Sequence, residues 1–172
     1  MAEKSTIRIQ PDQRQLRGLY QAFREMDVDS KNKLKNDVTL ISAWSVGELR
    51  NGAYGSPMQS QSIKVAETIR ANKDRIPNVT IGGSKSRFSG GAVSGQVLFG
   101  NEFGASPTSA NGAFPNGGRR FPFRSPQKGR GNEGYWIFKT LSGIQPEVTR
   151  RWKQSVTEVL NSWNKGAGGG IG

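Results

Sequence analysis

The sequence contains no cysteine and no histidine among its 172 residues. Without cysteine the chain can form no disulfide, no thiolate zinc site and no cysteine nucleophile. Without histidine it lacks the usual general base and the commonest metal ligand of proteins. We therefore expect no catalytic residue, no metal site and no cofactor, and we expect that the chain is not an enzyme.

Long hydrophobic runs are also missing. No apolar stretch approaches the roughly 20 residues that cross a bilayer, and the amino terminus has no apolar signal core, which predicts a soluble protein from an intracellular origin with no membrane partner. Hydrophobic residues make up only 33% of the chain, whereas glycine occurs 23 times. This composition indicates that part of the chain is loop or tail, or is ordered only against a partner.

Positive charge is abundant and unevenly placed. The net charge is +12, from 25 basic and 13 acidic residues. Residues 1–60 hold nine basic and seven acidic residues, a net of +2, so that residues 61–172 hold sixteen and six, a net of +10. This asymmetry points to a polyanion or to an acidic protein surface as the partner. The alternative is that basic loops only keep a glycine-rich protein soluble.

Apolar residues recur at helical spacing in three stretches, namely 11–26, 31–50 and 146–163. Asp29 or Ser30 is a suitable cap for the second stretch, and glycine at 52 is a typical end. Pro146 suits the first turn of the third stretch, which has the strongest amphipathic pattern in the chain. We expect a helix in each.

Strand patterns are weaker and shorter. Residues 96–99 form the clearest predicted strand, which 100–104 would close. The other candidates are 1–10 as an extended arm or edge strand, 62–70 as a strand or a short helix, 76–81 as a strand with a turn at 82–83, and 135–138 as a strand or the lead-in to the last helix.

These patterns together predict one α+β domain over residues 1–165. Two N-terminal helices and a C-terminal amphipathic helix pack on a small, mostly antiparallel, glycine-rich sheet with long loops. Residues 105–118 are expected to form a long loop, and 166–172 a flexible glycine-rich tail.

Two groups in the middle of the chain could carry a function. Glu102 is a lone carboxylate with no second acid or base nearby, which is typical of a salt bridge or a backbone cap rather than of catalysis. The cluster Arg119–Arg124 interleaves arginine with phenylalanine, a composition that suits phosphate and base contacts, and equally a subunit interface.

The order of these features resembles the tail-completion or neck proteins of long-tailed double-stranded DNA phages, a family similar to the minor tail protein Z type. The residues that carry the resemblance are Glu102-Phe103-Gly104, which close a predicted strand, and the Arg-Phe-Pro-Phe-Arg segment at 120–124 before the last helix. The loop between them is longer and richer in glycine than the resemblance would lead us to expect.

The resemblance implies a structural virion protein, made in the host cytoplasm, that completes the top of the tail and joins it to the head connector. It would form a ring, expected to be a hexamer, around the DNA channel. Its partners would be the head-side connector or stopper, the tail terminator or tube, and genomic DNA that passes without sequence-specific contact.

Within that hypothesis we assign interface roles to eight residues: Glu102, Phe103, Gly104, Arg119, Arg120, Phe121, Phe123 and Arg124. Contacts with the DNA channel or with an acidic partner are assigned to Lys85, Arg87, Lys128 and Arg130. Two alternatives remain, a tail-terminator ring and a free basic nucleic-acid-binding protein whose affinity would fall steeply with salt.

Overall fold

The computed structural model describes residues 6–9, 23–83, 88, 91–104 and 134–167. Its elements are β1 (Thr6–Ile9), α2 (Val28–Ala53), α3 (Gln59–Ala66), β2 (Arg70–Ala71), β3 (Val79–Gly82), α4 (Ser94–Phe103) and α5 (Ile137–Ala167). The three strands form one antiparallel sheet. The described part is therefore an α+β fold with a small antiparallel sheet, as predicted.

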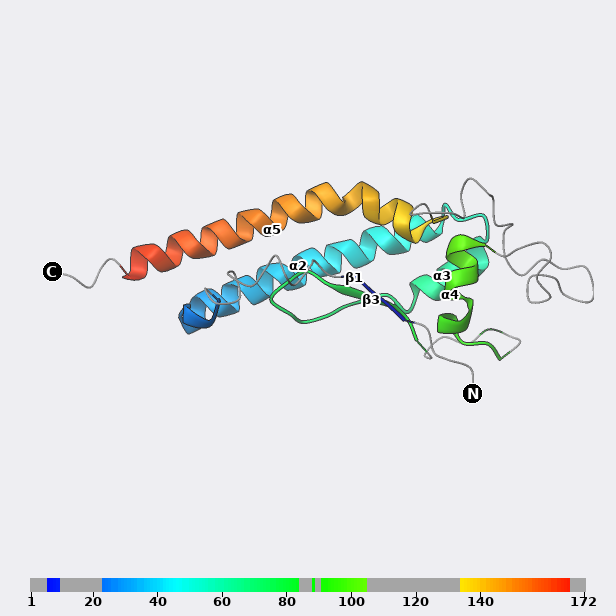
Figure 1. Ribbon diagram of the computed structural model, residues 1–172, viewed down its shortest axis with the longest axis horizontal. Coiled ribbons are helices and arrows are strands. Elements are labelled where there is room, and N and C mark those ends of the chain that lie inside the picture. Colours follow the sequence, from blue (N-terminus) through cyan, green and yellow to red (C-terminus); the bar gives the residue numbers. More distant parts are fainter. Residues whose placement is uncertain (1–5, 10–22, 84–87, 89–90, 105–133, 168–172) are drawn as a thin grey trace, which may run out of the picture.

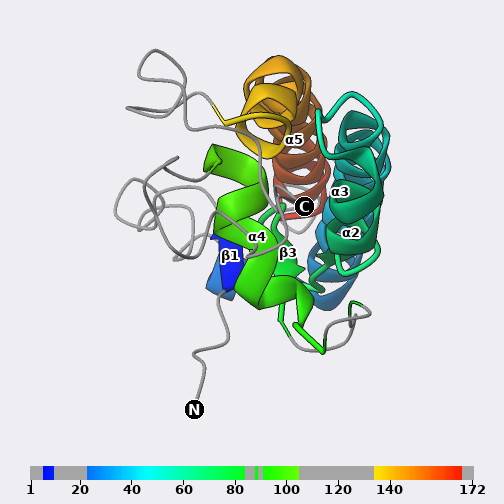
Figure 2. The ribbon, with the colours of Figure 1, turned by 90° about the vertical axis from the view of Figure 1, so that its right-hand side faces the viewer.

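Two long helices, α2 and α5, run side by side in opposite directions (Figure 1). With 26 and 31 residues, they are about 39 and 46 Å long at 1.5 Å per residue. The sheet, α3 and α4 are grouped toward one end of this pair. Seen end-on in Figure 2, α5 lies above, α2 and α3 lie to one side, and β1 and α4 lie to the other.

The sheet has the order β1–β3–β2, so β1 is an edge strand, as one of the two predictions for residues 1–10 states. The prediction of a strand at 76–81 is also confirmed over its second half, in β3. Gly82 and Gly83 follow with φ of 96° and 95°, a backbone conformation that glycine adopts without steric cost and that turns the chain after the strand.

The strand predicted at 96–99 is wrong, because these residues lie within the helix α4. Its buried positions are Ser94, Gly95, Val97, Leu98, Asn101 and Glu102, which is helical spacing. A short apolar run does not distinguish a strand from a buried helix, and here half of the buried stripe is polar, which hid the helical period. Gly104 then ends α4 with a φ of 74°.

Of the two alternatives predicted for residues 62–70, a strand or a short helix, the structure shows the helix over most of the segment. Helix α3 covers Gln59–Ala66, and only Arg70 at the end of the segment belongs to a strand. Ser62, Val65 and Ala66 form the buried face, at a spacing of three and four residues. The buried polar residue Ser62 weakens the apolar stripe and left the strand as a competing prediction.

Helix α5 begins at Ile137, well before the predicted start at Pro146. Pro146 lies inside the helix, where it has no N–H to donate to the carbonyl of Ser142. Figure 1 shows α5 bending in this yellow-to-orange part. The aromatic stretch 135–138 is therefore the lead-in to the last helix. The helix continues to Ala167, two residues into the tail expected at 166–172.

Helix α2 confirms the second predicted helix and extends it at both ends. Its N-cap is Asp27 rather than Asp29 or Ser30, since the Asp27 carboxylate accepts hydrogen bonds from the Ser30 amide at 2.7 Å and the Ser30 hydroxyl at 3.0 Å. The helix predicted at 11–26 lies mostly outside the described residues, apart from a helical turn at 23–25.

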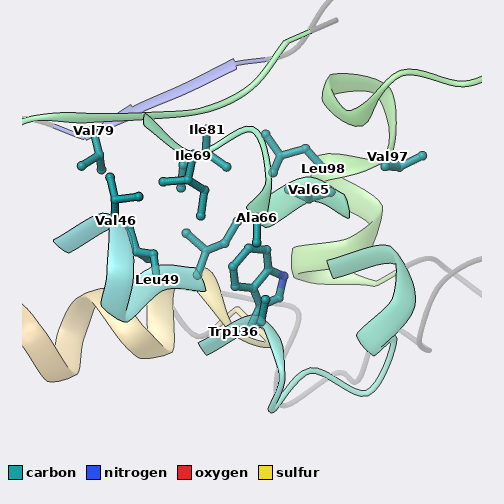
Figure 3. Close-up of a cluster of buried hydrophobic side chains, with 12 residues drawn as sticks. Val46, Leu49, Val65, Ala66, Ile69, Val79, Ile81, Val97, Leu98 and Trp136 are labelled. Atoms are coloured by element: carbon teal, nitrogen blue, oxygen red, sulfur yellow. The ribbon is translucent and has the colours of Figure 1, made fainter. Parts of the chain in front are cut away.

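The larger hydrophobic cluster joins the sheet to the helices. Val79 and Ile81 point from β3 toward Val46, Leu49 and Ile69 (Figure 3). The indole of Trp136, at the start of α5, lies beneath Ala66 of α3 in the same view. Because these residues come from α2, α3, β3 and the start of α5, the cluster holds the N-terminal end of α5 against the rest of the fold.

A smaller cluster lies farther along the helix pair. Phe23 and Met26 are buried with Leu34 and Val38 of α2 and Val159 of α5. Partly buried aromatic and aliphatic residues of α5 pack against it, namely Trp152, Val156, Leu160 and Trp163. Amphipathic packing, rather than helix propensity, thus stabilises the distal half of the pair.

Candidate interaction site

The buried carboxylate of Glu102 connects α4 to the start of α5. One of its oxygens, Oε2, accepts hydrogen bonds from the backbone N–H groups of Trp136 at 3.2 Å and Ile137 at 2.9 Å. The other, Oε1, accepts from the N–H of Phe138 at 2.9 Å. The first N–H groups of a helix have no partner within the helix, so Glu102 caps α5 from another element. The prediction of a backbone-capping role for Glu102 is confirmed.

The chain approaches Glu102 so closely that only glycine fits at position 134. A Cβ atom at Gly134 would lie 1.6 Å from Glu102 Oε1. Next to it, the N–H of Tyr135 donates to the backbone carbonyl of Glu102 at 2.8 Å. Residues 102–104 and 134–135 therefore lie together, although 30 positions separate them in the sequence.

Two opposing effects act on the ionisation of this carboxyl. Burial raises the pKa of Glu102 above its ordinary value, since desolvation disfavours the charged form. The hydrogen bonds from Phe138, Ile137 and Trp136 favour the carboxylate and oppose this rise in pKa. A buried carboxyl with three donors and no cation suits a structural cap.

A second polar group lies beside Glu102 in the same junction. The Asn101 side-chain oxygen accepts hydrogen bonds from the indole Nε1 of Trp136 at 2.7 Å and from the Ser62 hydroxyl at 2.9 Å. These three side chains join α3, α4 and the start of α5. Ser62 and Asn101 are not among the residues predicted from the sequence to form a site, and their sequence signal is weak: polar residues at helical positions of an apolar stripe.

A row of three phenylalanines runs from this junction to the surface, and we call it the aromatic row. The ring centroids of Phe99 and Phe103 are 6.3 Å apart, and those of Phe103 and Phe138 are 5.5 Å apart. Phe99 is 48% exposed, and the other two are partly buried. The row therefore begins in solvent on α4 and ends on α5.

The aromatic row ends at a cavity of about 410 Å³ between α2, α5 and the sheet. Phe138 lines it, together with apolar residues of α5 (Leu141, Ile144 and Val148) and of the sheet region (Ile9, Pro77 and Val79). Row and cavity share Phe138. Apolar surfaces of this kind often mark contacts with another protein.

The predicted interface residues are divided between described and undescribed parts of the chain. Phe103 lies in the aromatic row, and Gly104 ends α4. Glu102 is fully buried, so it can act on an interface only through the parts that it holds in place. The remaining predicted site residues lie outside the described residues, namely Lys85, Arg87, Arg119, Arg120, Phe121, Phe123, Arg124, Lys128 and Arg130.

Searches for two other kinds of feature find nothing in the described part of the chain. No cluster of three or more potential metal-ligating side chains occurs within residues 6–9, 23–83, 88, 91–104 and 134–167. Among the helices of these same ranges, none combines the length and apolarity needed to cross a membrane.

Comparisons with known proteins identify no relative. No protein-family model, no curated protein and no solved structure matches the chain.

Proposed function

We propose that this chain is a structural virion protein of the neck of a long-tailed DNA phage. In this role it completes the top of the tail and joins it to the head connector, as one subunit of a ring around the DNA channel. It has no enzymatic activity. The observation that carries the proposal is the aromatic row, which begins in solvent at Phe99 and ends at Phe138, a residue that also lines the cavity.

The aromatic row suits an assembly subunit because its apolar surface continues beyond what one chain covers. Aromatic residues are enriched in the buried cores of protein interfaces, where they supply large contact areas. In a closed ring of more than two subunits the interfaces are heterologous, so the row of one subunit would meet a different surface of its neighbour. We assign a second copy of this chain as the occupant.

The motif that suggests the family has a definite place in the fold. In Glu102-Phe103-Gly104, the first residue caps α5, the second belongs to the aromatic row and the third ends α4. The motif thus links the junction to the surface that we assign to assembly, although here it ends a helix and not the strand on which the resemblance was based.

The position of the second motif also supports the proposal. The Arg119–Arg124 cluster belongs to the segment 105–133, which carries five basic residues and one acidic residue. The described residues on either side of this segment, Gly104 and Gly134, adjoin the Glu102 junction. A basic segment is suited to contacts with an acidic surface of a neighbouring ring or with the phosphates of DNA.

The direct test is electron microscopy of lysates from a phage that lacks this gene. The proposal expects filled heads beside separate tails of normal length. Tails of uncontrolled length would instead identify a tail terminator, and intact virions would contradict a role in the neck.

Complementation with variants then tests the basic cluster. We expect Arg120→Glu with Arg124→Glu to lower the yield of joined virions by at least tenfold, while the soluble protein still folds. Lys35→Glu with Lys153→Glu is the matched control, because it changes the net charge equally at exposed positions on α2 and α5. Normal yield from the first pair would count against the assignment of this cluster.

A further inference from the structure

The solvent face of the sheet carries a cross-strand pair of arginines. In the register of the sheet, Thr80 of β3 lies opposite Arg8 of β1 and opposite Arg70 of β2. Side chains at directly opposed positions point to the same face of a sheet. Both arginines are exposed, whereas the intervening positions Ile7, Ile9 and Ala71 pack against the core.

Neither arginine is neutralised within the described part of the chain. The side chains of Arg8 and Arg70 make no ion pair and no hydrogen bond there, and the three ion pairs of the described residues all lie on α2 and α5. The hairpin loop that follows β2 adds exposed Lys73 and Arg75.

The one carboxylate of the hairpin loop is already engaged inside the loop. Asp74 accepts hydrogen bonds from the backbone N–H of Arg75 at 2.7 Å and from the Asn78 side-chain amide at 3.1 Å. Over residues 6–9 and 70–82 there are four basic side chains and this one acidic side chain, which leaves a net charge of +3. The face is therefore a basic patch.

The centre of the patch can also donate a hydrogen bond. The Thr80 hydroxyl oxygen accepts from the Asn72 side-chain amide at 2.8 Å, and its own proton has no acceptor among the described residues. Arginine, lysine, threonine and asparagine are the residues that commonly contact phosphate oxygens. The outward strand positions Thr6, Arg8, Thr80 and Arg70 include no apolar side chain, whereas the cores of protein interfaces are depleted of charge and rich in aromatic residues.

We propose that this sheet face binds the phosphate backbone of duplex DNA without reading its sequence. The inference rests on the proposed neck function and adds to it which face of the subunit is turned toward the channel. Arg8 and Arg70 lie two strands apart, about 10 Å at the usual strand spacing. Over that length of helix axis each strand of the duplex presents about three phosphates, at about 3.4 Å of axis per phosphate. The patch of one chain is small, but a ring repeats it, and repeated weak contacts add to a high avidity.

The test is the salt dependence of binding of the full-length protein to a fluorescently labelled duplex of random sequence, followed by anisotropy. The variant is Arg8→Gln with Arg70→Gln. The matched control is Lys35→Gln with Lys153→Gln, which removes the same charge from exposed positions on α2 and α5. The slope of log K against log salt is negative, and the loss of two phosphate contacts per chain should make it less steep by about 1.8, at about 0.9 per contact. The control should keep the slope of the parent protein.

Two results would overturn the proposal. Equal slopes for the sheet variant and the control would show that the sheet face makes no phosphate contact of its own. A sheet variant that binds DNA like the parent but fails to join heads to tails would show that the face meets an acidic protein instead. The neck function is judged separately by the gene deletion, so intact virions without this gene would reject that function and leave the DNA measurement standing.

Discussion

At the scale of single residues, the junction around Glu102 shows how a distant side chain supplies the N-cap that the residues before α5 lack. The residues before α5 are Gly134, Tyr135 and Trp136, and none of them can act as a side-chain N-cap. The cap comes instead from Glu102 of α4, which accepts three backbone N–H groups of the first turn. The start of α5 is therefore decided by a contact between distant parts of the chain.

Changes at this junction should destabilise the fold strongly. A Cβ atom at position 134 would collide with the carboxylate, so Gly134→Ala should displace Glu102 and lower the free energy of unfolding by about 3 kcal/mol. Glu102→Gln should cost about 1–3 kcal/mol, because an amide offers one acceptor oxygen in place of two and leaves a buried N–H unpaired. Urea unfolding followed by circular dichroism measures both changes.

Gly47→Ala is the control for these substitutions. A Cβ atom there would meet nothing within 4 Å, and alanine favours a helix interior by about 1 kcal/mol over glycine. This variant should be slightly more stable than the parent. A Gly134→Ala protein as stable as Gly47→Ala would mean that Glu102 does not hold α5.

At the scale of elements, the pairing of α2 with α5 includes a polar cluster on the surface. Glu147 accepts hydrogen bonds from Arg150 and Arg151 at 2.7 to 2.8 Å. The guanidinium of Arg151 also lies 4.3 Å from the ring centroid of Trp44 on α2, a cation–π contact between the two helices. Glu147 thus positions an arginine that bridges the pair.

The cluster should make the stability of the fold depend on pH in the acidic range. The hydrogen bonds from Arg150 and Arg151 lower the pKa of Glu147 to about 2. Because the pKa of Glu147 is lower in the folded chain than in the unfolded chain, the ionised Glu147 stabilises the fold at pH values above the ordinary pKa of a carboxyl group. This stabilisation is lost as the pH falls toward 2. We expect thermal midpoints of the parent and of Glu147→Gln to differ at about pH 6 and to converge near pH 2.

The size of this difference should also depend on salt, since the cluster is largely exposed and ions screen it. Repeating the two melts at about 1 M salt should reduce the difference at the higher pH. A difference between the two proteins that stays constant from about pH 6 to pH 2 would show that Glu147 acts by something other than its charge.

At the scale of the whole molecule, the aromatic row is the surface that one chain leaves partly open. We expect Phe99→Ser to lower the fraction of ring-shaped oligomers by at least tenfold. The stability of the monomer should not change, because the Phe99 side chain is 48% exposed in the single chain. Native mass spectrometry measures the oligomer, and a thermal melt measures the monomer.

The matched control for this prediction is Leu40→Ser. Leu40 is a large apolar residue on α2, 69% exposed and outside the row. The Leu40→Ser substitution should leave assembly unchanged. Equal loss of rings in both variants would show that general surface polarity, and not the aromatic row, governs assembly.

Several features of the fold were predictable because they depend on local patterns. The helical stripe of α2, the edge strand β1 and the strand before Gly82 follow directly from the spacing of their apolar residues. The lack of any catalytic companion predicted a structural role for Glu102, either a salt bridge or a backbone cap, and the structure shows the cap. The basic patch was not singled out, since nothing in the sequence places Arg8 beside Arg70.

The sequence by itself determined the α+β class, the amphipathic faces of the long helices and the excess of positive charge, because composition and periodicity depend only on the order of residues. Tertiary structure alone decided three other things. It selected the helix between the two alternatives for α3 and made a helix of α4, because the polar residues in their buried stripes are stable inside only when they meet partners such as Trp136. It started α5 at Ile137, since the capping carboxylate comes from a distant helix. It also brought two arginines from different strands onto one face, because strand register is set by pairing and not by sequence distance.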